Sequence, residues 1–253
     1  GQALQSLSNS KVFETIYVVG RRALPATQTA GLGPVPFEEV VVPDLFQLES
    51  HPKFAELRHK GRVSACLIAV GLGDHRNVSL KKLYQVDVKL AQILSRACSG
   101  LGVRALSLLS GMTADTSLAP LTEEELRLPG ELSLLDFFTW YPRVKGEAER
   151  AIIDSGVPKI RIFRPSTLVT DDIRFGWIDW MLFKIHYVLD PIIPSEWHSI
   201  HVRDVGHAMT IASEDALKGT TSDKDEEQQV TFLEYAHMTQ LLESRKAPRH
   251  SEL

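Results

Sequence analysis

The chain has 253 residues, a net charge of −4 and a pI near 6.2. Apolar residues make up 43% of it and charged residues 24%, which is typical of a soluble globular domain. The acidic balance disfavours nucleic acid and anionic membranes as partners, and no apolar run approaches the ~20 residues of a membrane span. We expect a cytoplasmic protein without a signal peptide, in which Cys66 and Cys98 are buried free thiols rather than a disulfide.

The pattern of apolar residues predicts strands that alternate with helices. Strands are expected at residues 15–20, 39–42, 63–70, 103–110, 159–163 and 199–202. Helical spacing is expected over 2–11, 46–59, 80–98, 140–155, 175–187 and 204–216, and loops over 24–37, 111–139 and 217–229. This alternation indicates α/β architecture with a doubly wound parallel sheet, which binds ligands at the carboxyl ends of its strands.

We expect one Rossmann-like domain over residues 1–253, with a small substrate or cap region from about 171–200 and 230–253. Four aromatic residues at helical spacing fall in the first part of that region: Trp177, Trp180, Phe183 and Tyr187. They are expected either to line a substrate pocket or to belong to the core.

The segment from Trp140 to Arg150 is the centre of the functional hypothesis. It predicts a helix with Pro142 in its first turn, a position that proline favours. Tyr141 and Lys145 are four residues apart and therefore share one face. The cation favours phenolate, so this pair can transfer a proton near neutral pH. The alternative is a surface helix that carries an unrelated pair.

Ser110 ends the fourth predicted strand, where a hydroxyl can hold a substrate carbonyl. With Tyr141 and Lys145 it forms a candidate catalytic set for hydride transfer between nicotinamide and a carbonyl. In this set Tyr141 would protonate the oxygen, and Lys145 would lower the tyrosine pKa and hold the nicotinamide ribose. Taken alone, a serine at the end of a strand is usually a turn residue.

Other strand ends predict where a dinucleotide would lie. Arg21 and Arg22 follow the first strand, where arginine accommodates the 2′-phosphate of NADP, although both could simply be solvated. Asp44, followed by Leu45, ends the second strand and is predicted either to meet adenine or to cap a turn.

The third and fifth strands end in further candidate cofactor contacts. These are Val70 and Gly71 on the third strand, and Pro165 and Ser166 after the fifth, where a plain strand-to-loop turn is the alternative. His198, His201 and His207 lack the spacing of a metal set, so no metal is expected.

With these residues in place the chain resembles the atypical short-chain dehydrogenase/reductases, and among them the Tat-interacting-protein-like branch. The likeness covers nearly the whole chain and is carried by residues 18–22, 84–87, 108–110, 141–147 and 163–165. The resemblance implies a Rossmann sheet, NADP(H) binding and the Ser110, Tyr141 and Lys145 set. It also implies a role as a cofactor-binding regulator as much as a metabolic enzyme.

Two features depart from that family. Its first strand and glycine-rich phosphate turn are missing, so Gly1 would be either the sole survivor of the turn or a residue left by cloning. The expected explanations are residues omitted from the sequence, a strand supplied by a partner, or reduced cofactor affinity. Gly111 also stands where a second serine often occurs, which makes Thr113 the fallback for the hydroxyl role of Ser110.

We therefore expect an NADP(H)-dependent oxidoreductase that acts on a small, unidentified carbonyl or alcohol. The acidic run at residues 123–125 and the missing phosphate turn favour a second hypothesis, a non-catalytic NADP(H)-binding regulator or scaffold with a protein partner or as a homo-oligomer. A degenerate fold that binds no nucleotide is the third.

Overall fold

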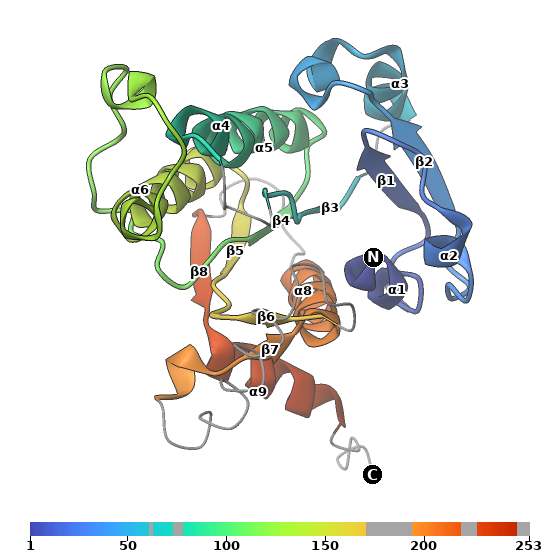
Figure 1. The fold of residues 1–253 in the computed structure, drawn as a ribbon. Coiled ribbons are helices and arrows are strands. Elements are labelled where there is room, and N and C mark those ends of the chain that lie inside the picture. The colour runs from blue at the N-terminus through green and yellow to red at the C-terminus, as the bar shows by residue number, and fades with distance from the viewer. Residues whose placement is uncertain (61–62, 73–77, 171–193, 219–226, 247–253) are drawn as a thin grey trace.

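The computed structural model describes residues 1–60, 63–72, 78–170, 194–218 and 227–246 (Figure 1). The predicted helix over 175–187, with Trp177, Trp180, Phe183 and Tyr187, lies outside these residues. Two parallel sheets form the centre of the described fold. One contains β1 (Ile16–Gly20) and β2 (Phe37–Val41), and the other has the order β3 (Ala65–Ile68), β4 (Ala105–Leu109), β5 (Lys159–Phe163) and β8 (Gln229–Leu233).

Helices cover both faces of the four-stranded sheet. One core packs β4 and β5 against α4 (Leu80–Tyr84), α5 (Leu90–Gly100) and α6 (Leu134–Ile153). A second core packs the opposite face against α8 (Val202–Leu217) and α9 (Tyr235–Lys246). Alternate side chains of β5 enter different cores, since Ile162 belongs to the first and Phe163 to the second. The predicted doubly wound parallel α/β fold is confirmed.

The remaining elements connect or flank these layers. They are α1 (Gln2–Leu7), α2 (Ala26–Thr29), η1 (Leu45–Ser50), α3 (Pro52–Lys60), η2 (Gln85–Lys89), η3 (Glu125–Arg127), β6 (Leu168–Val169), η4 (Ser195–Trp197) and β7 (Ile200–His201). The small pair β6–β7 is parallel and separate from the larger sheets. Residues 230–233, which the sequence analysis assigns to a cap region, belong instead to strand β8, which pairs with β5 in the main sheet.

Several predicted boundaries are wrong for identifiable reasons. The expected helix over 46–59 divides into η1 and α3 at His51, immediately before Pro52, because proline disfavours helical backbone in the residue that precedes it. The loop over 24–37 contains the short helix α2. Asp204 lies inside the first turn of α8, and His201 caps that helix by accepting a hydrogen bond from the Arg203 amide.

The helix that begins at Leu80 is continuous but irregular. Its middle five residues, Gln85–Lys89, form one turn of π-helix between α4 and α5. Such turns are rare and frequently occur at functional sites, because the extra residue re-aims neighbouring side chains. Asp87 lies in this turn and is buried. Within the described residues, no helix has both the length and the apolar character that a membrane span requires.

Candidate functional site

Helix α6 presents three polar side chains at four-residue intervals, Tyr141, Lys145 and Glu149. The helix begins at Leu134 rather than near Trp140, because Ser133 and Asp136 form a capping box that the sequence analysis missed. Pro142 therefore lies inside the helix and not in its first turn. The shared face of Tyr141 and Lys145 is unaffected, since it depends only on their spacing.

Lys145 makes a buried ion pair with Asp87 of the π-helical turn. Its Nζ lies 2.5 Å from Asp87 Oδ1, and both side chains are almost inaccessible to solvent. The other carboxylate oxygen, Asp87 Oδ2, is buried without a hydrogen-bond partner. Burial alone lowers the pKa of Lys145, but the Tyr141 phenol and the Asp87 carboxylate outweigh it and raise that pKa. Lys145 is therefore a fixed ammonium at neutral pH.

Gly71 lies against this ion pair at the end of the third strand segment. A Cβ at position 71 would stand 3.3 Å from Asp87 Oδ1 and 3.8 Å from Lys145 Nζ. The absence of a side chain keeps the approach to both charged groups open. Val70 precedes Gly71 and lines a narrow cleft together with Asp87, Ser110 and Lys145.

Tyr141 reaches the end of β4 from α6. A Cβ built at Gly111 would lie 3.0 Å from the phenol oxygen, and Lys145 Nζ lies 5.5 Å from the centre of the phenol ring. Burial raises the pKa of Tyr141, and the opposing effect of Lys145 is smaller. The predicted lowering of the pKa by Lys145 is present, but burial outweighs it, so the net shift is away from phenolate and Tyr141 is a neutral proton donor.

Ser110 lines the cleft, but its hydroxyl is hydrogen-bonded to Glu149. Its hydroxyl donates a 2.6 Å hydrogen bond to Glu149 Oε1, and Arg164 donates to both oxygens of the same buried carboxylate. A serine has one hydroxyl proton, so this contact leaves Ser110 only as an acceptor. Thr113, the alternative hydroxyl, is partly exposed on the loop after β4.

The candidate adenosine side of the site is on β1 and β2. Arg21 and Arg22 follow β1 directly and are exposed. Asp44 accepts a 3.0 Å hydrogen bond from the Phe46 amide and caps η1, as its second alternative predicts. The side chain of Leu45 is buried in the first core, so packing accounts for it.

The remaining predicted cofactor residues, Pro165, Ser166 and Gly1, differ in solvent exposure and in their hydrogen-bond partners. Pro165 is buried, and its carbonyl accepts a 3.0 Å hydrogen bond from the Met112 amide. The Ser166 hydroxyl donates to the Trp197 carbonyl at 3.0 Å. Gly1 is exposed, and its terminal amine donates to Gln28 at 3.3 Å.

The acidic loop is held against α6 by one of its carboxylates. Arg143 forms a 2.9 Å ion pair with Glu125 and lowers the pKa of Glu125 to about 2. In the part of the chain that the structure describes, no cluster of three or more histidine, cysteine, aspartate or glutamate residues could hold a metal ion.

Asp87, Glu149 and Arg164 are the site residues that the sequence analysis did not assign. Glu149 continues the four-residue spacing of Tyr141 and Lys145, so periodicity could have identified it. Asp87 enters the sequence analysis only as part of the resemblance over residues 84–87, although a lone carboxylate in an apolar helical stripe is itself a signal. The partner of each charge depends on tertiary packing and has no local sequence signature.

Comparison with known proteins identifies the fold but no close relative. No family model matches the chain, and no curated protein sequence matches it. Among solved structures, the UDP-Glc/GlcNAc 4-epimerase from Campylobacter jejuni is 17% identical with a TM-score of 0.55, covering 97% of this chain and 78% of its own. The similarity at this level of identity shows a shared Rossmann-type fold.

Two further solved structures give the same result. MoeE5 in complex with UDP-glucuronic acid and NAD is 17% identical with a TM-score of 0.52, over 92% of this chain and 74% of its own. A dTDP-4-dehydrorhamnose reductase from Clostridium acetobutylicum is 12% identical with a TM-score of 0.51, over 92% and 80% of the two chains. The parallel sheet and its helical layers are common to all of them.

Proposed function

We propose that this protein is an NADP(H)-dependent oxidoreductase of the short-chain dehydrogenase/reductase type, acting on a small carbonyl or alcohol. One observation carries the proposal: α6 places Tyr141 and Lys145 beside the ends of β3 and β4, with Lys145 fixed by Asp87 and approached past Gly71. Parallel sheets bind ligands at this edge. The narrower Tat-interacting-protein-like assignment is part of the proposal and rests on the sequence resemblance.

The residues around Lys145 suit a nicotinamide dinucleotide. A bound nicotinamide would supply or accept the hydride. Lys145 presents an ammonium for ribose hydroxyls, the unpartnered Asp87 Oδ2 adds an acceptor, and Gly71 leaves room for a close approach. Arg21 and Arg22 at the end of β1 supply the positive charge that favours NADP over NAD.

Proton transfer follows from the charge states of the two α6 residues. In the reductive direction the neutral Tyr141 phenol donates its proton to the carbonyl oxygen, and the Lys145 ammonium stabilises the phenolate that remains. In the oxidative direction the same phenolate accepts the proton of the alcohol. Asp87 holds Lys145 in place and keeps it charged throughout.

A hydroxyl that positions the carbonyl is the weakest member of the proposed set. Ser110 fulfils this role when its proton turns from Glu149 to the substrate, and Arg164 still neutralises Glu149 after that change. Thr113 is the second candidate, on the loop that follows Ser110.

The hydrogen bond of Ser110 also favours a second function, a non-catalytic NADP(H)-binding regulator. In the resting geometry its only hydroxyl proton is engaged by Glu149, and Gly111 beside Tyr141 has no side chain to replace it. A protein with this arrangement can hold the dinucleotide through Lys145 without positioning a carbonyl.

Turnover of Tyr141→Phe separates these two functions. NADPH oxidation is followed with a panel of small aldehydes and ketones. Tyr84→Phe is the matched control, because the Tyr84 hydroxyl donates a 2.7 Å hydrogen bond to Glu147, which lies on α6 like Tyr141. We expect the Tyr141→Phe variant to reduce the substrates about 10²–10⁴-fold more slowly than the wild type, as is typical for loss of a general acid. Tyr84→Phe should keep its rate.

Wild-type protein that binds NADPH but reduces none of the panel would support the regulator instead. A Tyr141→Phe protein as active as the wild type would exclude the proposed acid. Comparison of Ser110→Ala with Thr113→Val then identifies which hydroxyl positions the carbonyl, because only the loss of that hydroxyl lowers kcat.

A further inference from the structure

A polar groove lies between α1 and α8. It contains about 1510 Å³ of empty space, part of which is open to solvent. α8 packs against the face of the four-stranded sheet that is opposite α5 and α6 (Figure 1). None of the described residues that line the groove belongs to the cleft around Lys145, so the groove is separate from the proposed dinucleotide site.

The groove carries more positive than negative charge. Its described lining includes four lysines and arginines, which are Lys11, Arg203, Lys218 and Arg245, whereas Glu214 is the one acid among the same residues. The chain as a whole has a net charge of −4. An excess of cations in one groove of an acidic protein concentrates positive potential there, which favours an anionic ligand.

The cations lie toward the two ends of α8. Arg203 is in the first turn of the helix, and Lys218 follows its last residue. At a rise of 1.5 Å per residue, the distance between these two positions along the helix is roughly 22 Å. Arg245 of α9 joins Lys218 at the second end, because both donate hydrogen bonds to Asp215. The groove therefore presents positive charge at two separated places.

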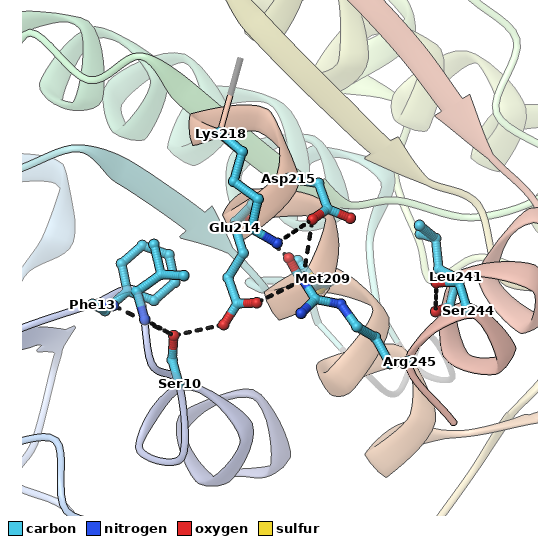
Figure 2. A network of polar contacts seen from close by, with 11 residues as sticks. Ser10, Phe13, Met209, Glu214, Asp215, Lys218, Leu241, Ser244 and Arg245 are labelled. Carbon is cyan, nitrogen blue, oxygen red and sulfur yellow. Dashed lines mark hydrogen bonds and ion pairs between the residues drawn. The ribbon is translucent and has the colours of Figure 1, made fainter. Parts of the chain in front are cut away.

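A network of polar contacts fixes the second end. Figure 2 shows Ser10 and Arg245 donating to the two carboxylate oxygens of Glu214, at 2.6 and 2.9 Å. Glu214 is buried, and with both oxygens engaged it needs no cation from a ligand. Two cations, Lys218 and Arg245, thus balance two carboxylates, and the exposed Lys11 leaves this end net positive.

Between the ends, side-chain amides line the α1 side of the groove. Gln2 and Gln5 share a face of α1, and Asn9 follows the helix. Gln5 donates to the Gly31 carbonyl and Asn9 to the Gln5 carbonyl, both at 2.8 Å, which fixes their orientation. An amide has two N–H donors and an acceptor oxygen, so one bond leaves capacity for a ligand. These groups match the donor and acceptor of a peptide bond.

Glu214 discriminates between kinds of anion. A nucleic acid carries a phosphate at every nucleotide, so some of its charges would lie against the Glu214 and Asp215 carboxylates. A peptide carries carboxylates only where its sequence places them, and can present neutral backbone elsewhere. An extended chain rises ~3.3 Å per residue, so about seven residues span the distance between the two ends. The pattern of the groove therefore favours a peptide.

We propose that the groove between α1 and α8 binds an extended acidic segment of a partner protein, whose carboxylates contact Arg203 at one end and Lys11 at the other. The amide side chains beside α1 bond the peptide backbone between these ends. A guanidinium suits a carboxylate because it donates two parallel hydrogen bonds. The groove exists before the segment binds, since α1 packs against α8 so closely that a Cβ at Gly206 would stand 2.8 Å from the Ala3 amide nitrogen.

Binding of two labelled peptides, measured by fluorescence anisotropy, tests the proposal. One has two glutamates at either end, separated by five serine and alanine residues, so its acidic pairs lie roughly 23 Å apart when extended. The other is an isomer of the same composition with all four glutamates in the centre. We expect the first peptide to bind about tenfold more tightly, because the isomer reaches only one end of the groove.

Variants of the protein then locate the bound peptide. The double variant Lys11→Gln with Arg203→Gln removes one exposed cation at each end and should weaken binding by about tenfold. Arg96→Gln is the matched control, because Arg96 is an exposed arginine on α5, where it pairs with Glu49 at 3.3 Å. Circular dichroism verifies that the variants are folded.

Four results would overturn the proposal. The first is no saturable binding up to about 1 mM peptide, and the second is equal affinity of the two isomers. The third is unchanged binding by the folded double variant. The fourth is a competitor that takes the same place: displacement of the peptide by NADPH would put it in the dinucleotide site, and displacement by a single-stranded oligonucleotide that binds more tightly would assign the groove to nucleic acid.

Discussion

The two parallel sheets of the molecule differ in how fully their polar groups are enclosed. The four-stranded sheet lies between two helical layers, and its buried charges are paired: Lys145 with Asp87, and Arg164 with Glu149. The two-stranded sheet has a small core of its own around Leu4, Ile16 and Val35, and its arginines face solvent. The comparison separates a half with paired, buried charges, which contains the proposed site, from a half that is held mainly by α1, η1 and α3.

The largest expected effect is in the half that contains the four-stranded sheet. Lys145→Met removes the partner of the buried Asp87 carboxylate and should destabilise the protein by about 3–5 kcal/mol. The free energy of unfolding in urea measures this loss. The double variant Asp87→Asn with Lys145→Met should recover most of it, because no buried charge remains. A single variant that loses less than about 1 kcal/mol would show that the pair is solvated.

A second variant loosens the contact between the halves. Gly206→Ala places a Cβ 2.8 Å from the Ala3 backbone, so α1 must move away from α8 at a cost of about 1–3 kcal/mol. Hydrogen exchange should accelerate in β1 and β2 while β4 and β5 stay protected. Gly1→Ala is the matched control, because nothing lies within 4 Å of its added Cβ. Equal acceleration in both sheets would contradict the division into two halves.

The smallest effect is at the half-buried ion pair between α6 and the acidic loop, where Arg143 lowers the pKa of Glu125 from 4.5 to about 2. A lowered pKa in the folded state contributes stability above the unfolded pKa, and this contribution is lost as the pH falls from about 4.5 to about 2. Glu125→Gln should therefore be less stable than the wild type at pH 7, with the difference vanishing near pH 2. Glu124→Gln, at the adjacent exposed carboxylate, should show no such pH-dependent difference.

The sequence supports the fold better than the site. Runs rich in apolar residues and bounded by turn residues locate β1, β4 and β5 within two residues. The prediction for the start of α6 is wrong because Pro142 is compatible with a first turn, whereas the capping box of Ser133 and Asp136 sets the start at Leu134.

Of the site, helical periodicity predicts only which side chains share one face of a helix. The spacing of Tyr141 and Lys145 predicts their shared face, but the direction of the tyrosine pKa depends on burial, which no local pattern contains. The engagement of Ser110 by Glu149 joins residues 39 positions apart, on a strand and a helix that meet only in the folded protein.

Fluorescence titration with NADPH and NADH tests most directly the claim that the molecule is built around a dinucleotide site. It is performed on the wild type and on the double variant Arg21→Ala with Arg22→Ala. The account predicts saturable binding in which NADPH binds about tenfold more tightly than NADH, a difference of about 1.4 kcal/mol, and loss of this preference in the double variant. Failure of the folded wild type to bind either nucleotide, or an unchanged preference in the double variant, would contradict it.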